Sequence, residues 1–391
     1  MREGCDCFRA GTHRPRVDRE QVMAASYTWH PRVDGIDPKW PIPQSLMADE
    51  LFSSFLIRSA LAHGCSPIAL TSVIWPAQRV WTLDLDRGPA PNNLEVLSRL
   101  SGISVPVLQS STLQPAAHCI LNLSSPHFGV WPWVLVLGCR NRRHAGGLQC
   151  CPLCMGQPNP FYRIQWRLAW HTRCSLHRTR LIDCCPTCQA ALHPSLLQQG
   201  GSIAYCHFCK SPLTRSVQAD VSEGAAAFQH YVDDMVWSGT WYGHLQLSCC
   251  EWLGVARAML SLVRSASGAT PHAQEVFCEV MGTSVLPEPA HLGLPFEYLS
   301  VGERERLLEV VWSIMRAGPA RFLEAASAVF PPSALRSFAK GAPRLMALVP
   351  SKLTSRHCTI NRKVTMAGTQ KPQAVLRSWL RLIRKIKRDG L

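Results

Sequence analysis

The cysteines are the residues in this chain whose types and spacing most clearly indicate chemistry. Nine of the 18 cysteines fall between Cys150 and Cys209, a window of 60 residues in a chain of 391. A Cys-x2-Cys pair is followed, after 19 intervening residues, by a Cys-x2-His pair. A second Cys-x2-Cys pair is followed, after 17 intervening residues, by a third Cys-x2-Cys pair. The two sets are Cys151, Cys154, Cys174 and His177, and Cys185, Cys188, Cys206 and Cys209.

This spacing predicts two structural zinc sites. Two residues between ligands allow a tight turn to direct both donor atoms at one ion, and the second pair completes a tetrahedron. Four protein ligands leave no position for a reactive water, so neither site is expected to be catalytic. Binding free energies of about 10 to 16 kcal/mol would stabilise a short, loop-rich segment in place of a large core.

Duplicated cysteines and nearby histidines leave the ligand register open. Cys150 could replace Cys151, and Cys184 could replace Cys185. His171 or His207 could also compete for a position. Four cysteines outside this window are expected to be small buried apolar residues, namely Cys65, Cys119, Cys278 and Cys358.

Direct searches for catalytic motifs argue against an enzyme. The chain contains no Gly-Lys dipeptide and therefore no Walker A phosphate loop, and none of its 15 histidines begins a His-x-Glu sequence. The absence of His-x-Glu excludes the deaminase signature, and since no histidine is directly followed by Glu, the His-Glu-x-x-His metalloprotease signature is excluded as well. A zinc-dependent nuclease is the less favoured alternative. The paired carboxylates are expected in turns and on the surface: Asp84 and Asp86, and Asp233 and Asp234.

The positive charge is concentrated at one end of the chain. Of 41 Lys and Arg and 26 Asp and Glu, residues 336–391 contain 14 cations and one acid, or +13, which leaves +2 for the rest. From 374 to 388, apolar residues recur at helical spacing with cations beside them. The predicted DNA-binding residues are Arg377, Arg381, Arg384, Lys385, Lys387 and Arg388. A packed terminal helix and an interfacial membrane helix remain alternatives.

The periodicity elsewhere is helical, which predicts a mainly α fold. Asp49 is the expected cap of a helix that ends at Gly64, and residues 92–113 resemble two short helices about Gly102, as in a helix-turn-helix. Further helices are predicted at Phe228 to Trp241, Trp252 to Val263, Glu303 to Met315 and Ala320 to Phe330.

These patterns divide the chain into five parts. We expect an unstructured leader at 1–36, an N-terminal helical domain at 37–140, a tandem zinc-finger segment at 141–215, a helical domain at 216–335 and a basic tail at 336–391. No apolar stretch resembles a signal peptide or a membrane span, which predicts a cytoplasmic protein in a reducing compartment without membrane contact.

Several stretches resemble the TniQ family of bacterial transposon target-selection proteins. The sequence from Asp49 to Ala60, followed by His63-Gly64, is similar to the family's opening motif, and Leu94 to Ile103 is similar to its next. The order continues with Cys151-Pro-Leu-Cys154, with Trp166-Arg167-Leu168 and with the remaining ligand pairs, so that the resemblance runs from about Trp40 to Leu213. Phe55 stands where the family usually has Trp.

The resemblance implies a non-catalytic adaptor of a mobile genetic element. Such a protein engages target DNA, or a targeting partner such as a CRISPR effector, and recruits an AAA+ ATPase of the TniB or TnsC type. The ATPase in turn brings the transposase. The family also makes a homodimer plausible. The alternative is a zinc-finger transcriptional regulator, but the 94–113 hairpin carries only one cation, Arg99, which favours the adaptor.

Overall fold

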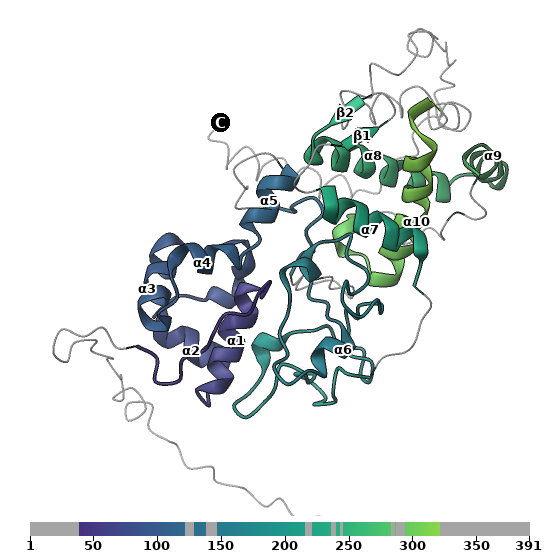
Figure 1. The fold of residues 1–391 in the computed structure, drawn as a ribbon. Helices are drawn as coiled ribbons and strands as arrows, with labels where there is room; N and C mark the ends of the chain where they lie inside the picture. Colours follow the sequence, from purple (N-terminus) through teal and green to yellow (C-terminus); the bar gives the residue numbers. More distant parts are fainter. Residues whose placement is uncertain are drawn as a thin grey trace, which may run out of the picture.

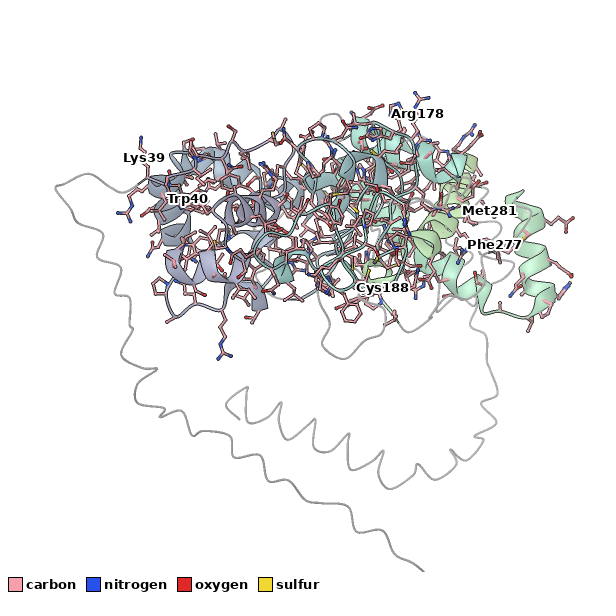
Figure 2. The ribbon with its side chains drawn as sticks, turned by 90° about the horizontal axis from the view of Figure 1, so that it is seen from below. Lys39, Trp40, Arg178, Cys188, Phe277 and Met281 are labelled. Carbon is pink, nitrogen blue, oxygen red and sulfur yellow. The ribbon has the colours of Figure 1, made fainter. Side chains whose placement is uncertain are left out.

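The computed structural model describes residues 39–121, 129–137, 147–215, 221–235, 240–242, 245–282, 286 and 294–320. Within these residues the fold is mainly helical, as predicted, and its sheet consists of two short strands. Helices α1 to α4 lie together at one end, helices α7, α8 and α10 lie at the other, and the loop-rich segment 147–215 lies between them (Figure 1). Lys39 and Met281 mark the two ends in Figure 2.

The N-terminal group contains α1 (Phe52–Ala62), α2 (Pro67–Ile74), α3 (Pro91–Ser101) and α4 (Val105–Ser110), with 3-10 turns at Val80–Thr82 and Leu85–Arg87. Its apolar side chains form one core that includes Phe52, Phe55 and Leu97. Gly102 has a φ of 75°, a left-handed conformation that glycine adopts without steric cost, and it ends α3. The predicted helix, glycine turn and helix are therefore present.

The N-terminus of α1 is not capped as predicted. Asp49 has a φ of 61° and lies before the helix, whose N-cap residue is Leu51. The carboxylate of Asp86 takes this role from a distant position, because it accepts bonds from the backbone N–H and the hydroxyl of Ser53 at 2.8 and 3.0 Å. A negative charge at this end is favourable because free N–H groups point outward there.

The C-terminal group contains α7 (Glu223–Met235), α8 (Cys249–Ser267), α9 (Pro271–Met281) and α10 (Val301–Ala317). Ser248 with Glu251, and Ser300 with Glu303, form capping boxes that satisfy the first N–H groups of α8 and α10. The predicted helices at 252–263 and 303–315 are therefore confirmed. Helix α5 (Gln114–Leu121) links this group to the N-terminal one by packing on α8.

The predicted helix from Phe228 to Trp241 is wrong at its end. Helix α7 ends at Met235, and β1 (Thr240–Tyr242) pairs antiparallel with β2 (Leu245–Leu247). β-Branched and aromatic residues such as those of β1 fit a strand as well as a helix face, so the apolar period alone could not separate the two.

One apolar cluster joins the loop-rich segment to the C-terminal helices. Trp133 is buried, its ring lies 6.0 Å from Phe228 and 5.5 Å from Phe296, and its indole N–H donates to the carbonyl of Leu253. Trp166, Trp170 and Leu181 belong to the same cluster. Metal centres in this segment would therefore add to a shared core.

The five domain boundaries drawn from the sequence stay a prediction.

Two sequence predictions lie outside the described residues: the helix at 320–330 apart from its first residue, and the basic tail with its six DNA-binding candidates. The leader at 1–36 and Cys358 lie outside them as well. Cys65, Cys119 and Cys278 are half-buried, so the expectation that they are buried is wrong for these three. Among the described helices, none combines the length and the apolar character that crossing a membrane requires.

Candidate metal centres

The structure brings together the first set of four predicted ligands. Cys151 precedes the short helix α6 (Pro152–Met155), which carries Cys154, while Cys174 and His177 belong to a turn farther along the chain. Nδ1 of His177 lies 3.5, 3.2 and 3.7 Å from the sulfurs of Cys151, Cys154 and Cys174. The sulfurs of Cys154 and Cys174 are 3.8 Å apart. All four donor atoms lie within 4.8 Å of one another. We call this set the cysteine–histidine centre.

The second set of four predicted ligands also converges. Sγ of Cys185 lies 3.6 Å from Sγ of Cys209, and Sγ of Cys188 lies 3.7 Å from Sγ of Cys206. Cys185 and Cys206 are buried, whereas Cys188 and Cys209 are half-buried. We call this set the four-cysteine centre.

Both centres have the dimensions of a tetrahedral zinc site. Zn–S bonds of about 2.3 Å and Zn–N bonds of about 2.0 Å separate neighbouring donor atoms by about 3.5 to 3.8 Å. The donor distances above agree with these values, and they are too long for disulfides, so the cysteines are free thiols. The two groups could therefore each hold a metal ion. Four donors close the coordination sphere, which suits a structural ion.

Three of the four ligand pairs share one backbone turn. In each, the amide N–H four residues after the first cysteine donates to that cysteine's carbonyl: Arg178 to Cys174, Gln189 to Cys185 and Lys210 to Cys206, at 2.9, 2.9 and 3.1 Å. These three donating residues have φ values of 56°, 59° and 60°. Each turn is closed by the N–H of its first cysteine, which donates to the carbonyl of Thr179, Ala190 or Ser211. The left-handed residue reverses the chain, so that both ligands of the pair reach the same centre.

The remaining pair, Cys151 and Cys154, lies on a helical turn instead. Pro152 occupies the first helical position, where its missing N–H has no cost, and Met155 N–H donates to the carbonyl of Cys151. The hydroxyl of Thr179 lies 3.3 Å from Sγ of Cys151. This contact links the helical turn to the opposite hairpin.

Hydrogen bonding favours thiolate at one cysteine of each centre. The thiols of Cys154 and Cys174 lower the pKa of Cys151 through hydrogen bonds to its sulfur. Hydrogen bonds from Ser211 lower the pKa of Cys209 to about 6. The hydrogen bonds to Cys151 in turn raise the pKa values of Cys154 and Cys174, so the thiols of the first centre share their protons unevenly. Because metal ions bind thiolates, binding would release the protons that remain.

The structure also places the four competing residues. Neither Cys150 nor Cys184 belongs to a ligand group: Cys150 is paired through its backbone with Ile182, and burial raises the pKa of its thiol well above the usual value. Nε2 of His171 contacts Asp233 at 2.9 Å. The ring of His207 packs on the ring of His193 at 5.7 Å. The geometry thus supports the ligand sets that contain Cys151 and Cys185, without Cys150, Cys184, His171 or His207.

A buried ion network was missed by the sequence analysis. The side chain of Arg167 is fully buried and binds Asp86 at 2.7 Å and Asp84 at 2.6 Å. Burial raises the pKa of Asp86 to about 6, and the charge of Arg167 opposes this. The expectation that these two carboxylates lie on the surface is therefore wrong for Asp86. Because Asp86 also caps α1, Arg167 connects the segment of the cysteine–histidine centre to the N-terminal helices.

A second buried arginine connects the cysteine–histidine centre to the C-terminal helices. Arg304 of α10 donates to Oε1 of Gln149 at 2.7 Å and to the carbonyl of Ala169. The amide of Gln149 in turn donates to the carbonyl of His171. Asp233 of α7 accepts from Trp170 and contacts His171. The segment is therefore held by polar bonds on both sides.

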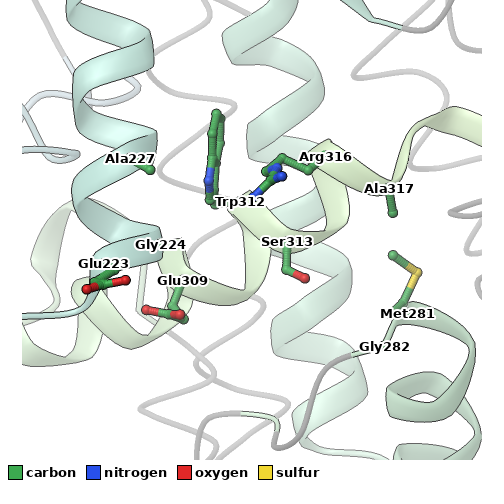
Figure 3. A pocket seen from close by; sticks show the side chains of 10 residues that line it. All are labelled: Glu223, Gly224, Ala227, Met281, Gly282, Glu309, Trp312, Ser313, Arg316 and Ala317. Carbon is green, nitrogen blue, oxygen red and sulfur yellow. The ribbon is translucent and has the colours of Figure 1, made fainter.

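A pocket of about 640 Å³ lies where α7, α9 and α10 meet (Figure 3). Glu223 and Glu309 lie close together at one end, Met281 lies across from them, and Trp312 and Arg316 extend from α10. A Cβ atom at Gly224 would lie 2.9 Å from Oε1 of Glu309, so a larger residue there would require the Glu309 side chain to shift. The pocket thus combines apolar surface with both signs of charge.

Comparison with known proteins assigns the region that carries these features. Residues 41–181 match the TniQ family model, which identifies this part of the chain as a TniQ region and confirms the resemblance drawn from the motifs. The family is associated with the selection of transposition targets. The match includes the cysteine–histidine centre and ends before the four-cysteine centre. No curated protein matches the chain.

Proposed function

We propose that the chain is a non-catalytic targeting adaptor of transposition. It engages target DNA or a targeting partner and recruits an AAA+ ATPase, which brings the transposase. The observation that carries this proposal is the TniQ match, whose span encloses a metal centre with no free coordination position. Such a centre serves as a scaffold.

Zinc is the metal that we assign to both centres. Thiolate and imidazole donors at tetrahedral spacing suit this ion, which has no geometric preference of its own. All eight donors are needed for the assignment: Cys151, Cys154, Cys174, His177, Cys185, Cys188, Cys206 and Cys209. The ions would hold segments whose backbone is mostly turns.

A transcriptional regulator is less well supported. Base readout in the major groove generally uses Arg, Lys, Asn or Gln on the second helix of the hairpin. Helix α4 has six residues, and its exposed side chains are Pro106, Val107, Gln109 and Ser110, of which only Gln109 is a base-reading type and none is a cation. The hairpin therefore suits packing or protein contact better than phosphate contact.

A zinc nuclease is also less well supported. In the part of the chain that the structure describes, the two groups of possible metal ligands are both saturated by four side chains. Asp84 and Asp86 are paired with Arg167, and Asp233 is paired with His171. These carboxylates are committed to structural contacts.

The pocket at α7, α9 and α10 is the site that we assign to the protein partner. Its mixture of the Trp312 and Met281 surfaces with Glu309 and Arg316 can bury an apolar side chain while pairing charges at the rim. Interfaces commonly combine such a core with a polar rim. DNA contact is assigned to a different part of the chain, the predicted basic tail.

Co-purification with an AAA+ ATPase encoded beside this gene tests the proposal. Arg316→Glu should reduce retention of the ATPase, because it reverses a charge at the pocket. Arg306→Glu is the matched control, since Arg306 is exposed on the same helix but does not line the pocket. Equal loss in both variants, or a wild-type protein that retains no ATPase, would contradict the proposal.

A further inference from the structure

The four-cysteine centre presents aromatic rings to solvent. Phe208 is 73% exposed and Tyr205 is 46% exposed, and both lie on the turn that carries Cys206 and Cys209. The ring of His207 lies 6.5 Å from that of Phe208 and 5.7 Å from that of His193. Three rings from two separate loops therefore form a continuous row.

This row is held on a rigid support. The backbone N–H of Phe208 lies 3.4 Å from Sγ of Cys206, and the hairpin is closed by the bond from Cys206 N–H to Ser211 O. His193 precedes the 3-10 turn Pro194–Leu196, which packs against α2. Because the rings are already positioned, binding a flat ligand would cost little conformational entropy.

The charges around the row are positive. Residues 184–215 contain no Asp or Glu, and they include the exposed cations Lys210 and Arg215. Nζ of Lys210 donates to the carbonyl of His207, which fixes the ammonium group beside the rings. Exposed rings next to cations without carboxylates suit a ligand that has flat bases and phosphates.

We propose that this surface, defined by His193, Tyr205, His207, Phe208 and Lys210 and called the aromatic face, binds unpaired nucleotides. One base stacks on Phe208 while Lys210 contacts a phosphate. Duplex DNA does not fit, because its bases already stack on one another. The proposal goes beyond the adaptor role, since it specifies the chemistry of a second surface that lies outside the TniQ match.

Leu176 provides a matched control. It occupies the same position in the turn between Cys174 and His177 as Phe208 occupies between Cys206 and Cys209, and it is 62% exposed. Leucine is apolar but has no π face. Arg178, beside the first turn, and Cys188, in the four-cysteine centre, lie at opposite edges of the molecule (Figure 2). The two surfaces can therefore be tested separately.

The experiment measures fluorescence anisotropy of labelled oligothymidylate with the full chain carrying its metal. Excess unlabelled duplex is added to occupy phosphate contacts such as those predicted for the tail. Phe208→Ala and Phe208→Leu should each weaken binding at least about fivefold, whereas Phe208→Trp and Leu176→Ala should not. Metal content and circular dichroism confirm that each variant is folded. An oligouridylate of equal length separates RNA from DNA as the source of the nucleotides.

Three outcomes would overturn the proposal. Wild-type affinity in Phe208→Ala would show that the face does not contact the strand. Wild-type affinity in Phe208→Leu together with loss in Phe208→Ala would show that an apolar contact, and not stacking on an aromatic ring, holds the base. Binding that duplex abolishes would assign the strand to phosphate contacts alone. None of these outcomes would alter ATPase retention, so the adaptor proposal is tested independently.

Discussion

The two metal centres have equal numbers of ligands but different connections to the fold. The cysteine–histidine centre has three buried cysteines and lies in a segment that Arg167 connects to the N-terminal helices and Arg304 connects to α10. The four-cysteine centre is built from two similar turns, and two of its cysteines are half-buried. A ligand set alone thus does not determine how much of the protein depends on a metal.

The largest expected difference between the centres concerns global stability. Cys154→Ser should destabilise the whole described core, because its segment carries Trp166 and Trp170 of the shared cluster. Cys188→Ser should mainly loosen residues 184–215, because they contribute smaller side chains, such as Leu192 and Leu213, to that cluster. Three ligands hold zinc poorly, so much of the site's binding energy of about 10 to 16 kcal/mol would be lost. Near-ultraviolet circular dichroism reports the buried tryptophans, and limited proteolysis reports the local opening.

Similar near-ultraviolet tryptophan signals in Cys154→Ser and Cys188→Ser would contradict the expected difference between the two centres. Cys150→Ser and Cys184→Ser are the matched controls, since each lies beside a ligand but outside the ligand groups. Both should keep the wild-type signal.

An intermediate effect is expected at the bond between Arg167 and Asp86. Arg167→Met should lower the free energy of unfolding by about 3 to 5 kcal/mol, because it leaves a buried carboxylate unpaired. Adding Asp86→Asn should recover part of this loss. Chemical denaturation of the single and double variants measures both changes, and additive losses would contradict the pairing.

The same pair predicts a pH dependence. The pKa of Asp86 is raised by burial to about 6, above its unfolded value, so the folded state takes up a proton as the pH falls. Removing Arg167 raises this pKa further. The loss caused by Arg167→Met should therefore be smaller at about pH 5.5 than at about pH 7.5. Denaturation at the two pH values measures the change.

The smallest effect concerns the left-handed turn residue Gln189. Gln189→Gly should change stability by at most about 1 kcal/mol in the favourable direction, because glycine adopts a positive φ without steric cost. Gln189→Val should be destabilising, since a β-branched residue is strongly disfavoured there. Thermal unfolding compares the two variants. A stable valine variant would mean that the turn does not require this conformation.

Local features of the fold could be predicted from the sequence, and long-range ones could not. The ligand pairs and the turn at Gly102 depend on residues within a few positions of one another. The cap of α1 depends on Asp86, which is 33 residues from Ser53, and on Arg167, which is 81 residues from Asp86. The motif Trp166-Arg167-Leu168 drew attention to this arginine in the sequence, but it did not identify Asp86 as its partner.

The adjacent cysteines Cys150 and Cys151 also show that long-range contacts limit prediction from the sequence. Spacing allowed either Cys150 or Cys151 to be a ligand, and the convergence of the Cys151 sulfur with the other three donor atoms decides between them. His171 was similarly a candidate ligand until Asp233 of α7 was seen to contact it. Both decisions required contacts with residues that lie far along the chain.

The metal content of the purified chain tests the central claim most directly. Elemental analysis after removal of loosely bound metal should give close to two zinc ions per chain, one in Cys188→Ser, and two in both Cys150→Ser and Cys184→Ser. A well-folded wild-type protein that contains no metal would contradict the account.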